Sequence, residues 1–321
     1  MPSAAQCEKK IDEFLAVECA VGRILGPFDG NFVPMVHLNR LGAVPKGTPG
    51  KYRLIVDLSY PSGGSVNDGI LSSLCSLSYV SVESAAQTVL QLGRGTLLAK
   101  IDIRDAYRNI PVHPEDRWLL GMSWRGGVFI DTVLPFGLRS APKIFNAVAD
   151  AMEWMVRRNG IRELCHYLDD FLVFGSPESN ECAQNLSALI RWAEWLGFPL
   201  AFEKVEGPST TLTFLGIEFD TDALILRLPE GKLVTLRNLI VSWRGRRWCL
   251  KSELQSLAGK LQHVCKVVRL GTSFLRRVFE LLGGVQHDHH HIKLNSGMHS
   301  DLAWWDLFLE SWNGISMLRR S

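Results

Sequence analysis

Two short apolar segments flank a pair of aspartates near the middle of the chain. Residues 165–175 read CHYLDDFLVFG, and aromatic and aliphatic side chains predominate in residues 164–168 and 171–174. A Gly-Ser-Pro turn signal ends the second segment. This pattern predicts a β-hairpin with Asp169 and Asp170 at its tip. For the hairpin alone, an ordinary solvated turn is an equally good interpretation, since Asp tolerates turn dihedrals well.

A third aspartate, Asp102, ends another apolar segment, LLAKIDI at residues 97–103, which predicts a strand. A buried carboxylate needs a cation or a metal ion, and pairing with Lys100 or Arg104 is the ordinary explanation. Three carboxylates that converge from a strand end and a hairpin tip would repel one another without a divalent cation between them. Mg²⁺ suits such oxygen ligands together with phosphate oxygens. Two such ions would serve phosphoryl transfer to a nucleic-acid 3′ hydroxyl.

Apolar residues at helical spacing predict helices over residues 83–92, 144–158 and 182–196. The buried positions expected in the second of these are Ile144, Phe145, Val148, Met152 and Met155. A capping box at residues 252–255 predicts another helix start, and the apolar positions that follow are Leu254, Leu257, Ala258, Leu261 and Val264. Two hairpins are predicted around residues 47–50 and 125–127.

Composition and cysteine usage narrow the protein class. With 321 residues, 46% hydrophobic and 21% charged, the chain can form two or three subdomains with proper cores. The N-terminal sequence MPSAAQCEKKIDEF lacks the apolar core of a signal peptide, and no segment approaches the length of a membrane span. Seven cysteines are scattered without a Cys-x-x-Cys pair. We expect a soluble intracellular protein, cytoplasmic or nuclear, with no membrane partner.

Charge is distributed unevenly along the chain. Residues 227–281 contain twelve Lys and Arg but three Glu, a net charge of +9 in a chain whose total is only +2. A basic C-terminal part beside an acidic remainder is typical of a nucleic-acid groove next to a carboxylate site. Within it, WRGRRW at residues 243–248 either stacks on bases and binds phosphate, or is a packed tryptophan flanked by surface arginines. A metal site at His287 and residues 289–291 is disfavoured, because no cysteine or acidic residue stands at ligand spacing.

The order of motifs along the chain resembles that of reverse transcriptases. KYRLIVDLS, KIDIRDAYR, LPFGLRSAPKIFN, YLDDFLVF, LAFEK and FLGIEF occur in the family's order within residues 44–219. LPFGL resembles gypsy-like retrotransposons, whereas VPKGTPGKYRLIVDLSYPSGGSVND and the amphipathic tail SDLAWWDLFLESWNG are similar to DIRS-type elements. The resemblance implies an α+β right-hand polymerase with fingers, a palm built on an antiparallel ferredoxin-like sheet, and a helical thumb.

The resemblance also implies a division of the chain. Residues 1–43 would be an N-terminal extension at the edge of the fingers, and residues 44–220 the fingers and palm. Residues 221–285 would be the basic helical thumb. Residues 286–321 would be a connection-like tail that stops before a ribonuclease H domain, so that no RNA-cleaving activity is expected of this chain.

The metal ligands that the resemblance implies are the three aspartates and one carbonyl group. Asp102 and Asp169 would bridge two Mg²⁺ ions, for which Mn²⁺ could substitute. The carbonyl oxygen of Ile103 and the carboxylate of Asp170 would complete the site.

The resemblance implies a nucleotide site in two segments. Lys46 and Arg53 would bind the triphosphate from a basic hairpin. Asp105 and Ala106 belong to a turn whose main-chain amides approach the triphosphate, and the side chain of Asp105 would support the local backbone rather than bind metal. The ring of Tyr107 would pack beneath the sugar and exclude a 2′ hydroxyl.

Other positions carry roles implied by the same resemblance. Phe136 would contact the nascent base pair, at a position where retroviral enzymes carry Gln. Lys204 is either an acid that assists pyrophosphate departure or a surface lysine. Contacts with the primer or template are implied for Tyr167, Phe214, Leu215 and Gly216.

The function implied is RNA-directed DNA polymerisation by a retroelement enzyme. Its partners would be deoxynucleotides and a primed RNA or DNA template, within a longer polyprotein that carries ribonuclease H and recombinase or integrase domains. One alternative is an inactive, truncated fragment that only binds nucleic acid. Another is an RNA-templated RNA polymerase, which Tyr107 and the YLDD sequence, in place of Gly-Asp-Asp, disfavour.

Overall fold

The centre of the fold is a four-stranded antiparallel sheet, the palm sheet, in the order β7-β8-β4-β9. The computed structural model describes residues 7–29, 35–45, 52–285, 287, 289–312 and 315–317. The palm strands are β4 (Leu97–Asp102), β7 (Leu164–Tyr167), β8 (Asp170–Gly175) and β9 (Glu206–Ser209). Strand β4 pairs with both β8 and β9, and β7 pairs with β8. The predicted hairpin and the predicted strand before it are both confirmed, and they lie next to each other.

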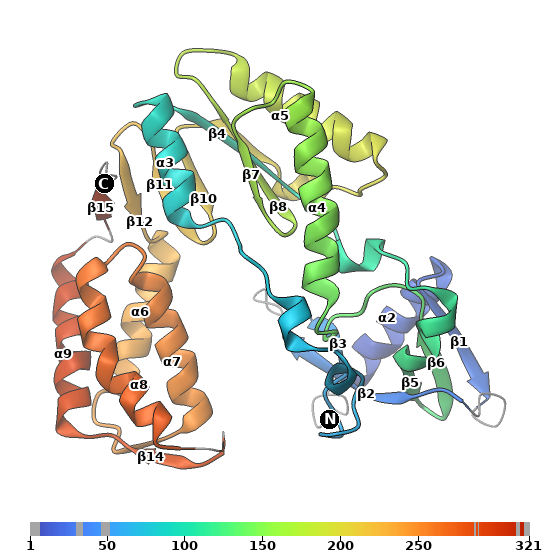
Figure 1. Cartoon of the computed structure of the whole chain (residues 1–321). Helices are drawn as coiled ribbons and strands as arrows, with labels where there is room; N and C mark the ends of the chain where they lie inside the picture. Colours follow the sequence, from blue (N-terminus) through green and yellow to red (C-terminus); the bar gives the residue numbers. More distant parts are fainter. Residues whose placement is uncertain are drawn as a thin grey trace.

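Helices α4 (Ala141–Arg158) and α5 (Glu181–Trp195) cover one face of the palm sheet, as Figure 1 shows. Phe145 of α4 and Leu189 of α5 share a core with Phe171 of β8. The start of α5 lies close to Gly175, the last residue of β8. A Cβ added at Gly175 would lie 2.3 Å from the backbone nitrogen of Cys182.

The buried face of α4 differs from the expected one. Phe145 and Met152 are buried as predicted, but Ile144 is 39% exposed. Ala149 and Val156 are buried instead. The buried stripe begins at Ala141 and continues through Phe145, Ala149 and Met152 to Val156, in steps of four, four, three and four residues. This is the spacing of a single helix face.

A second, five-stranded sheet forms the finger sheet, in the order β1-β6-β5-β2-β3. Its strands are β1 (Ile24–Asp29), β2 (Leu38–Pro45), β3 (Tyr52–Asp57), β5 (Gly121–Trp124) and β6 (Gly127–Asp131). Helix α2 (Glu8–Ala20) packs on it through Ile11 and Leu15, which join the core of Leu54 and Met122. The hairpin predicted around residues 125–127 is confirmed as β5 and β6. In the other predicted hairpin, β2 pairs with β3, and the turn between them lies outside the described residues.

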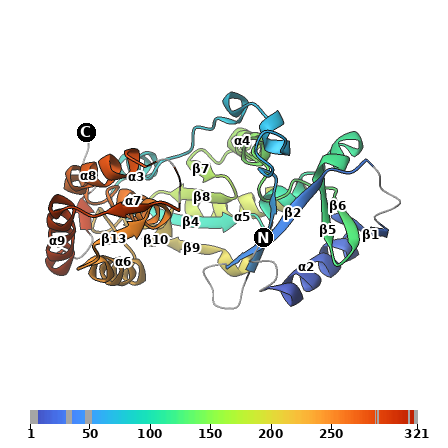
Figure 2. The ribbon, with the colours of Figure 1, turned by 90° about the horizontal axis from the view of Figure 1, so that it is seen from below.

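The C-terminal part forms a helical bundle, the thumb bundle, on the opposite side of the palm from the finger sheet (Figures 1 and 2). Its helices are α6 (Glu230–Trp243), α7 (Lys251–Val264), α8 (Arg276–Gly283) and α9 (Ser296–Ser311). A short ladder of β13 (Trp248–Leu250) and β14 (His291–Lys293) closes one end. Between palm and bundle lies a sheet of β10 (Thr211–Phe214), β11 (Ile217–Asp220), β12 (Ile225–Arg227) and β15 (Ile315–Met317). Helix α3 (Val82–Leu92) packs into the same core.

The five apolar positions predicted on α7 are all buried. The helix begins two residues earlier than the predicted capping box at Ser252: β13 runs directly into α7, with Leu250 as the N-cap residue. The Leu250 N–H donates to the Glu253 carboxylate at 2.9 Å. Trp243 is 2% exposed in the core, which favours the packed-tryptophan interpretation for that residue, whereas Trp248 is 56% exposed. None of the helices in the described ranges has both the length and the apolar character that a membrane span requires.

The contact between Gly175 and α5 can be tested by stability. Gly175→Ala should destabilise the protein by about 1–3 kcal/mol, because the added methyl group meets backbone atoms of Cys182 that cannot move without shifting the helix. The melting temperature measures this. As the control, Gly259→Ala in α7 adds a methyl group with nothing within 4 Å, and should leave the melting temperature unchanged or raise it. A melting temperature for Gly175→Ala at or above that of the parent would contradict the close packing.

Candidate active site

Three aspartates meet at one end of the β4–β8 pair. Asp102 is the last residue of β4 and lies directly opposite Asp170, the first residue of β8. Asp169 precedes it in the hairpin turn, where Leu168 has a φ of +53°. The Ile103 N–H donates to the Asp169 carbonyl at 3.0 Å, which joins the hairpin to the end of β4. Asp169 is thus in the turn as predicted, and Asp170 is already part of the strand.

Lysine side chains and burial both act on the carboxylates of this site. Asp102 is 9% exposed, and its carboxylate accepts a hydrogen bond from the Lys204 Nζ at 2.8 Å. Burial raises the pKa of Asp170 to about 7, and the negative charges of Asp169 and Asp102 act in the same direction, against the lowering effect of Lys100. Burial acts to lower the pKa of Lys204, but the hydrogen bond to Asp102 and the neighbouring aspartates outweigh it and raise that pKa. The site therefore favours additional positive charge.

The donor set fits a hard cation. It consists of carboxylate oxygens with the Ile103 carbonyl at the same strand end, and oxygen ligands of this kind are those that Mg²⁺ prefers. Among the described residues, no three His, Cys, Asp and Glu side chains already form an assembled metal cluster. Asp102 instead divides its hydrogen bonds between Lys204 and Asp170. The observation that suits a cation is geometric: Asp102, Asp169 and Asp170 meet at the strand end that also carries the Ile103 carbonyl.

Tyr107 lies on a tight turn that follows β4. Asp105 begins this turn with a φ of +56°, and its carbonyl accepts from the Arg108 N–H at 2.6 Å. The Tyr107 ring is half-buried, with its centroid 5.3 Å from that of Phe136 and 5.8 Å from that of Phe145. Of the two residues that precede Tyr107, Ala106 is buried and Asp105 is exposed. Two predicted nucleotide-binding segments, the turn at 105–107 and the loop at Phe136, are therefore in contact.

The loop of Phe136 is held against the finger sheet. The Val56 N–H donates to the Phe136 carbonyl at 3.2 Å. Gly137 has a φ of +116°, and a Cβ there would lie 2.2 Å from the Val56 carbonyl oxygen, so only glycine fits. Asn67 fastens the loop from the other side, with its amide donating to the Gly137 carbonyl at 2.9 Å and accepting from the Arg139 N–H at 2.8 Å. Nothing in the sequence singled out Asn67.

The basic residues expected to bind the triphosphate are described only in part. Lys46 lies outside the described residues. The backbone of Arg53 belongs to β3 and is paired with Val44. Their roles remain predictions.

The residues expected to contact primer or template lie on two hairpins, and Tyr167 pairs with Asp170 on the first of them. The Tyr167 ring packs against the Tyr79 ring at a tilt of 31°, with 4.7 Å between centroids. Tyr79 is 41% exposed in a Ser-rich connection. Sequence reasoning did not select Tyr79, although a single aromatic residue in a polar segment could have indicated a functional position. Leu215 and Gly216 form the tip of the β10–β11 hairpin. The side chain of Phe214 is 2% exposed and packs in the core, so a contact of this residue with the primer would have to come from its backbone.

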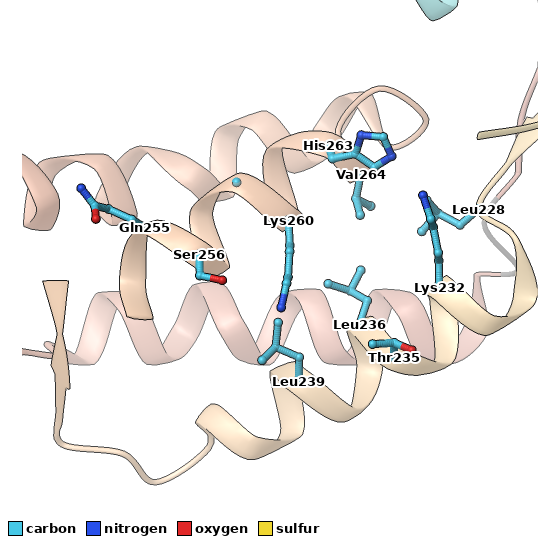
Figure 3. Close-up of a pocket in the computed structure, with 11 residues that line it drawn as sticks. Leu228, Lys232, Thr235, Leu236, Leu239, Gln255, Ser256, Lys260, His263 and Val264 are labelled. Atoms are coloured by element: carbon cyan, nitrogen blue, oxygen red, sulfur yellow. The ribbon is translucent and has the colours of Figure 1, made fainter. Parts of the chain in front are cut away.

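A basic cavity of about 490 Å³ lies between α6 and α7, close to this hairpin tip. Figure 3 shows Lys232, Lys260 and His263 around it with Leu236 and Val264. The Lys232 Nζ donates to the Gly216 carbonyl at 3.2 Å, which ties the hairpin tip to α6. Burial lowers the pKa of His263, and the charges of Lys232 and Lys266 lower it further. The cavity thus combines an apolar floor with concentrated positive charge.

Solved structures share the overall fold of this chain. A foamy viral protease-reverse transcriptase in complex with an RNA/DNA hybrid superposes with a TM-score of 0.69 at 17% identity, covering 97% of this chain and 38% of that one. At this identity the likeness shows the fold alone. The expected α+β right-hand polymerase fold is confirmed.

Sequence comparisons point to the same family. The Gag-Pro-Pol polyprotein of mouse mammary tumor virus is 23% identical over 249 residues, which are 75% of this chain and 13% of that protein. The Pol polyprotein from the transposon gypsy of Drosophila melanogaster is 32% identical over 98 residues, 30% of this chain and 9% of that protein. The chain thus spans a small part of these longer relatives.

Residues 44–219, more than half of the chain, match the sequence profile described as reverse transcriptase (RNA-dependent DNA polymerase). The match covers the three aspartates, the turn at Tyr107 and the loop at Phe136. This chain belongs to the reverse transcriptase family.

Proposed function

We propose that this chain is an RNA-directed DNA polymerase, which transfers a nucleotidyl group from a deoxynucleotide to a primer 3′ hydroxyl. The observation that carries the proposal is the register of β4 and β8, which sets Asp102 opposite Asp170 in a chain of this family. The foamy viral neighbour was solved with an RNA/DNA hybrid, and the fold shared with it supports a primed RNA or DNA template as the partner of this chain.

We propose Asp102, Asp169, Asp170 and the Ile103 carbonyl as the ligands of two Mg²⁺ ions, with Mn²⁺ as a possible substitute. When bound, such ions lower the pKa of an attacking hydroxyl and stabilise the leaving pyrophosphate. The chain's own contribution is to hold four oxygen donors at one strand end. The pairing of Asp102 with Asp170, next to the Asp169 turn, supports this assignment, because it gathers the carboxylates at one strand end.

The remaining groups would hold the deoxynucleotide. The proposed triphosphate contacts are Lys46, Arg53 and the main-chain amides at Asp105 and Ala106. The Tyr107 ring would lie under the sugar, and its packing on Phe136 and Phe145 supports a rigid surface there. Phe136 would add apolar contact with the nascent base pair.

Lys204 is the proposed proton donor to departing pyrophosphate. Its Nζ lies 2.8 Å from Asp102, and its raised pKa keeps it protonated at neutral pH. This geometry supports a role in the site over that of an ordinary surface lysine.

The primer–template duplex would lie along the thumb bundle. Tyr167, Leu215 and Gly216 would contact the primer end, and the cavity at Lys232 and Lys260 would receive the phosphate backbone. An apolar floor with flanking lysines suits a sugar–phosphate strand, since phosphates dominate such affinity.

We further propose a gypsy-like or DIRS-type retrotransposon as the source, and a longer polyprotein with ribonuclease H and recombinase or integrase domains as the whole protein. The proposed division is an extension (1–43), fingers and palm (44–220), thumb (221–285) and tail (286–321). In the structure, α9 of the tail shares one core with α6 and α7.

Primer extension on an RNA template with Mg²⁺ and deoxynucleotides tests the activity directly. Asp169→Asn should reduce extension on the order of 10²–10³-fold or more, because a charged group next to the reacting phosphates is lost. Duplex affinity should stay within about twofold, since the substitution removes negative charge and keeps the shape. Asp222→Asn, an exposed aspartate outside the site, is the charge-matched control and should extend normally.

Two outcomes would contradict the proposal. If Asp169→Asn lost duplex binding together with extension, Asp169 would be a folding residue. If the folded parent bound primer–template but extended nothing, the chain would be an inactive fragment.

Sugar selection can be tested at Tyr107. Tyr107→Val should lower the preference for deoxynucleotides over ribonucleotides on the order of tenfold or more, because the ring that would clash with a 2′ hydroxyl is removed. Steady-state kcat/KM for the two nucleotides measures the preference. Tyr107→Phe keeps the ring and should retain the preference; equal loss in both variants would argue against steric exclusion.

The role of the thumb cavity can be tested through salt dependence. Lys260→Ala should weaken duplex binding for all sequences and reduce the slope of log K against log salt by about 1, because one phosphate contact is lost. Fluorescence anisotropy at several salt concentrations measures the slope. Arg191→Ala on the exposed side of α5 removes the same charge far from the cavity and should leave the slope unchanged. The cavity would lose its assigned role if both variants behaved alike.

A further inference from the structure

Helix α2 carries a buried carboxylate at its C-terminal end. Glu18 is 7% exposed, an unusual burial for an acidic side chain that lies outside the residues matched to the family. A buried charge persists in a fold only when it is paired and hydrogen-bonded. The residue that pairs with Glu18 therefore shows which segment of the chain α2 holds in place.

The partner is Arg108, the residue directly after Tyr107. The Glu18 Oε2 accepts from the Arg108 Nε at 3.0 Å and from a terminal guanidinium nitrogen at 2.6 Å. The other terminal nitrogen donates to Asp131 at the end of β6, at 2.5 Å. Arg108 is 5% exposed and Asp131 1% exposed. A planar guanidinium held on two sides in this way fixes the position of its own backbone.

The network includes a second arginine from the segment after α2. The Arg23 guanidinium pairs with the Asp105 carboxylate at 3.2 Å and with Glu18 at 3.5 Å. It also approaches the Asn109 side-chain oxygen, at 3.5 Å. Arg23 and Glu18 thus contact the residues on both sides of Tyr107.

Hydrogen bonds to the backbone also fix the segment of Arg23 against the end of β6. The Arg23 carbonyl accepts from the Thr132 N–H and hydroxyl, each at 3.0 Å. Thr132 follows Asp131, and its own carbonyl accepts from the Val112 N–H at 2.8 Å. Burial raises the pKa of Asp131 to about 6, although the charge of Arg108 opposes that rise. The whole arrangement therefore depends on Arg108 keeping both of its carboxylate partners.

We propose that α2 is a positioning element for nucleotide selection, in which Glu18 and Arg23 hold the turn at residues 105–108 and thereby the Tyr107 ring. This inference rests on the proposed polymerase function. Glu18 and Arg23 touch no substrate in this scheme; they act through Arg108 and Asp105. Their loss should loosen the turn and weaken discrimination at the sugar more than it slows the reaction.

The first experiment is independent of activity. Hydrogen–deuterium exchange of the full chain would compare Glu18→Gln and Arg23→Met with the parent. Peptides covering residues 104–110 should exchange at least a few-fold faster in both variants, because the Arg108 and Ile110 amides are bonded within the turn. Peptides covering the hairpin of β7 and β8 should be unchanged.

The matched control is Arg125→Met, which removes the ion pairs of α2 to the β5–β6 turn, at 3.2 Å to Glu8 and 2.9 Å to Asp12. This variant loosens α2 without touching the turn at 105–108, and its exchange there should equal that of the parent. Glu18 is buried, so Glu18→Gln can unfold the finger sheet. Arg23, with its side chain 24% exposed, provides the variant expected to remain folded.

The second experiment is kinetic. In Arg23→Met, KM for deoxynucleotides should rise roughly tenfold and the preference over ribonucleotides should fall, with kcat changed by less than about threefold. Primer–template affinity should be unchanged.

The outcomes separate the two proposals. If the parent had no polymerase activity but exchange at 104–110 were faster in the two variants than in the parent, the proposed function would be overturned and the structural coupling would stand. An active parent whose Arg23→Met variant matches it in exchange, KM and sugar preference would overturn the inference. Equal effects from Arg125→Met would also overturn it, since they would reflect general loosening of α2.

Discussion

The antiparallel pairing of β4 with β8 is the constraint on which the site depends. It sets Asp102 opposite Asp170 and brings the Asp169 turn to the end of β4. Because side chains alternate along a strand, a shift of one residue in this register would turn one aspartate to the opposite face. The register is held by the packing of both faces of β4. Leu98 joins the core shared with the thumb bundle, and Ile101 joins the core beneath α4 and α5.

The concentration of negative charge at this strand end has consequences for its surroundings. Asp102 is bound to Lys204, and Lys100 on the same strand pairs with Glu206 at 2.9 Å. Burial, together with the charges of Asp169 and Asp102, raises the pKa of Asp170 despite the opposing charge of Lys100. The excess of basic residues in 227–281 lies on the thumb bundle, where it offers positive potential to a phosphate backbone without neutralising the aspartates.

At the nucleotide site, hydrogen bonds made by loops join the palm to the finger sheet, and the Tyr107 ring packs on Phe136. The loop of Phe136 and Gly137 is bonded to Val56 of β3 and to Asn67. The turn at Tyr107 is bonded through Arg108 to α2 and β6. A site assembled from such loops on rigid sheets keeps its geometry because each loop is fastened on two sides.

Much of this protein is determined by short-range sequence pattern. Apolar segments with turn residues were enough to predict the Asp169 hairpin and the strand of Asp102, and helical spacing predicted α5 and the buried stripe of α7. Local patterns succeed there because the period of a strand or helix is set by its own backbone. The tertiary structure alone decided which face of α4 packs, that Phe214 is buried, and that Lys204 pairs with Asp102, 102 residues away. It also decided the pairing of Arg108 with Glu18 across 90 residues. Such contacts join residues from separate elements, and their energy depends on burial that no local stretch of sequence specifies.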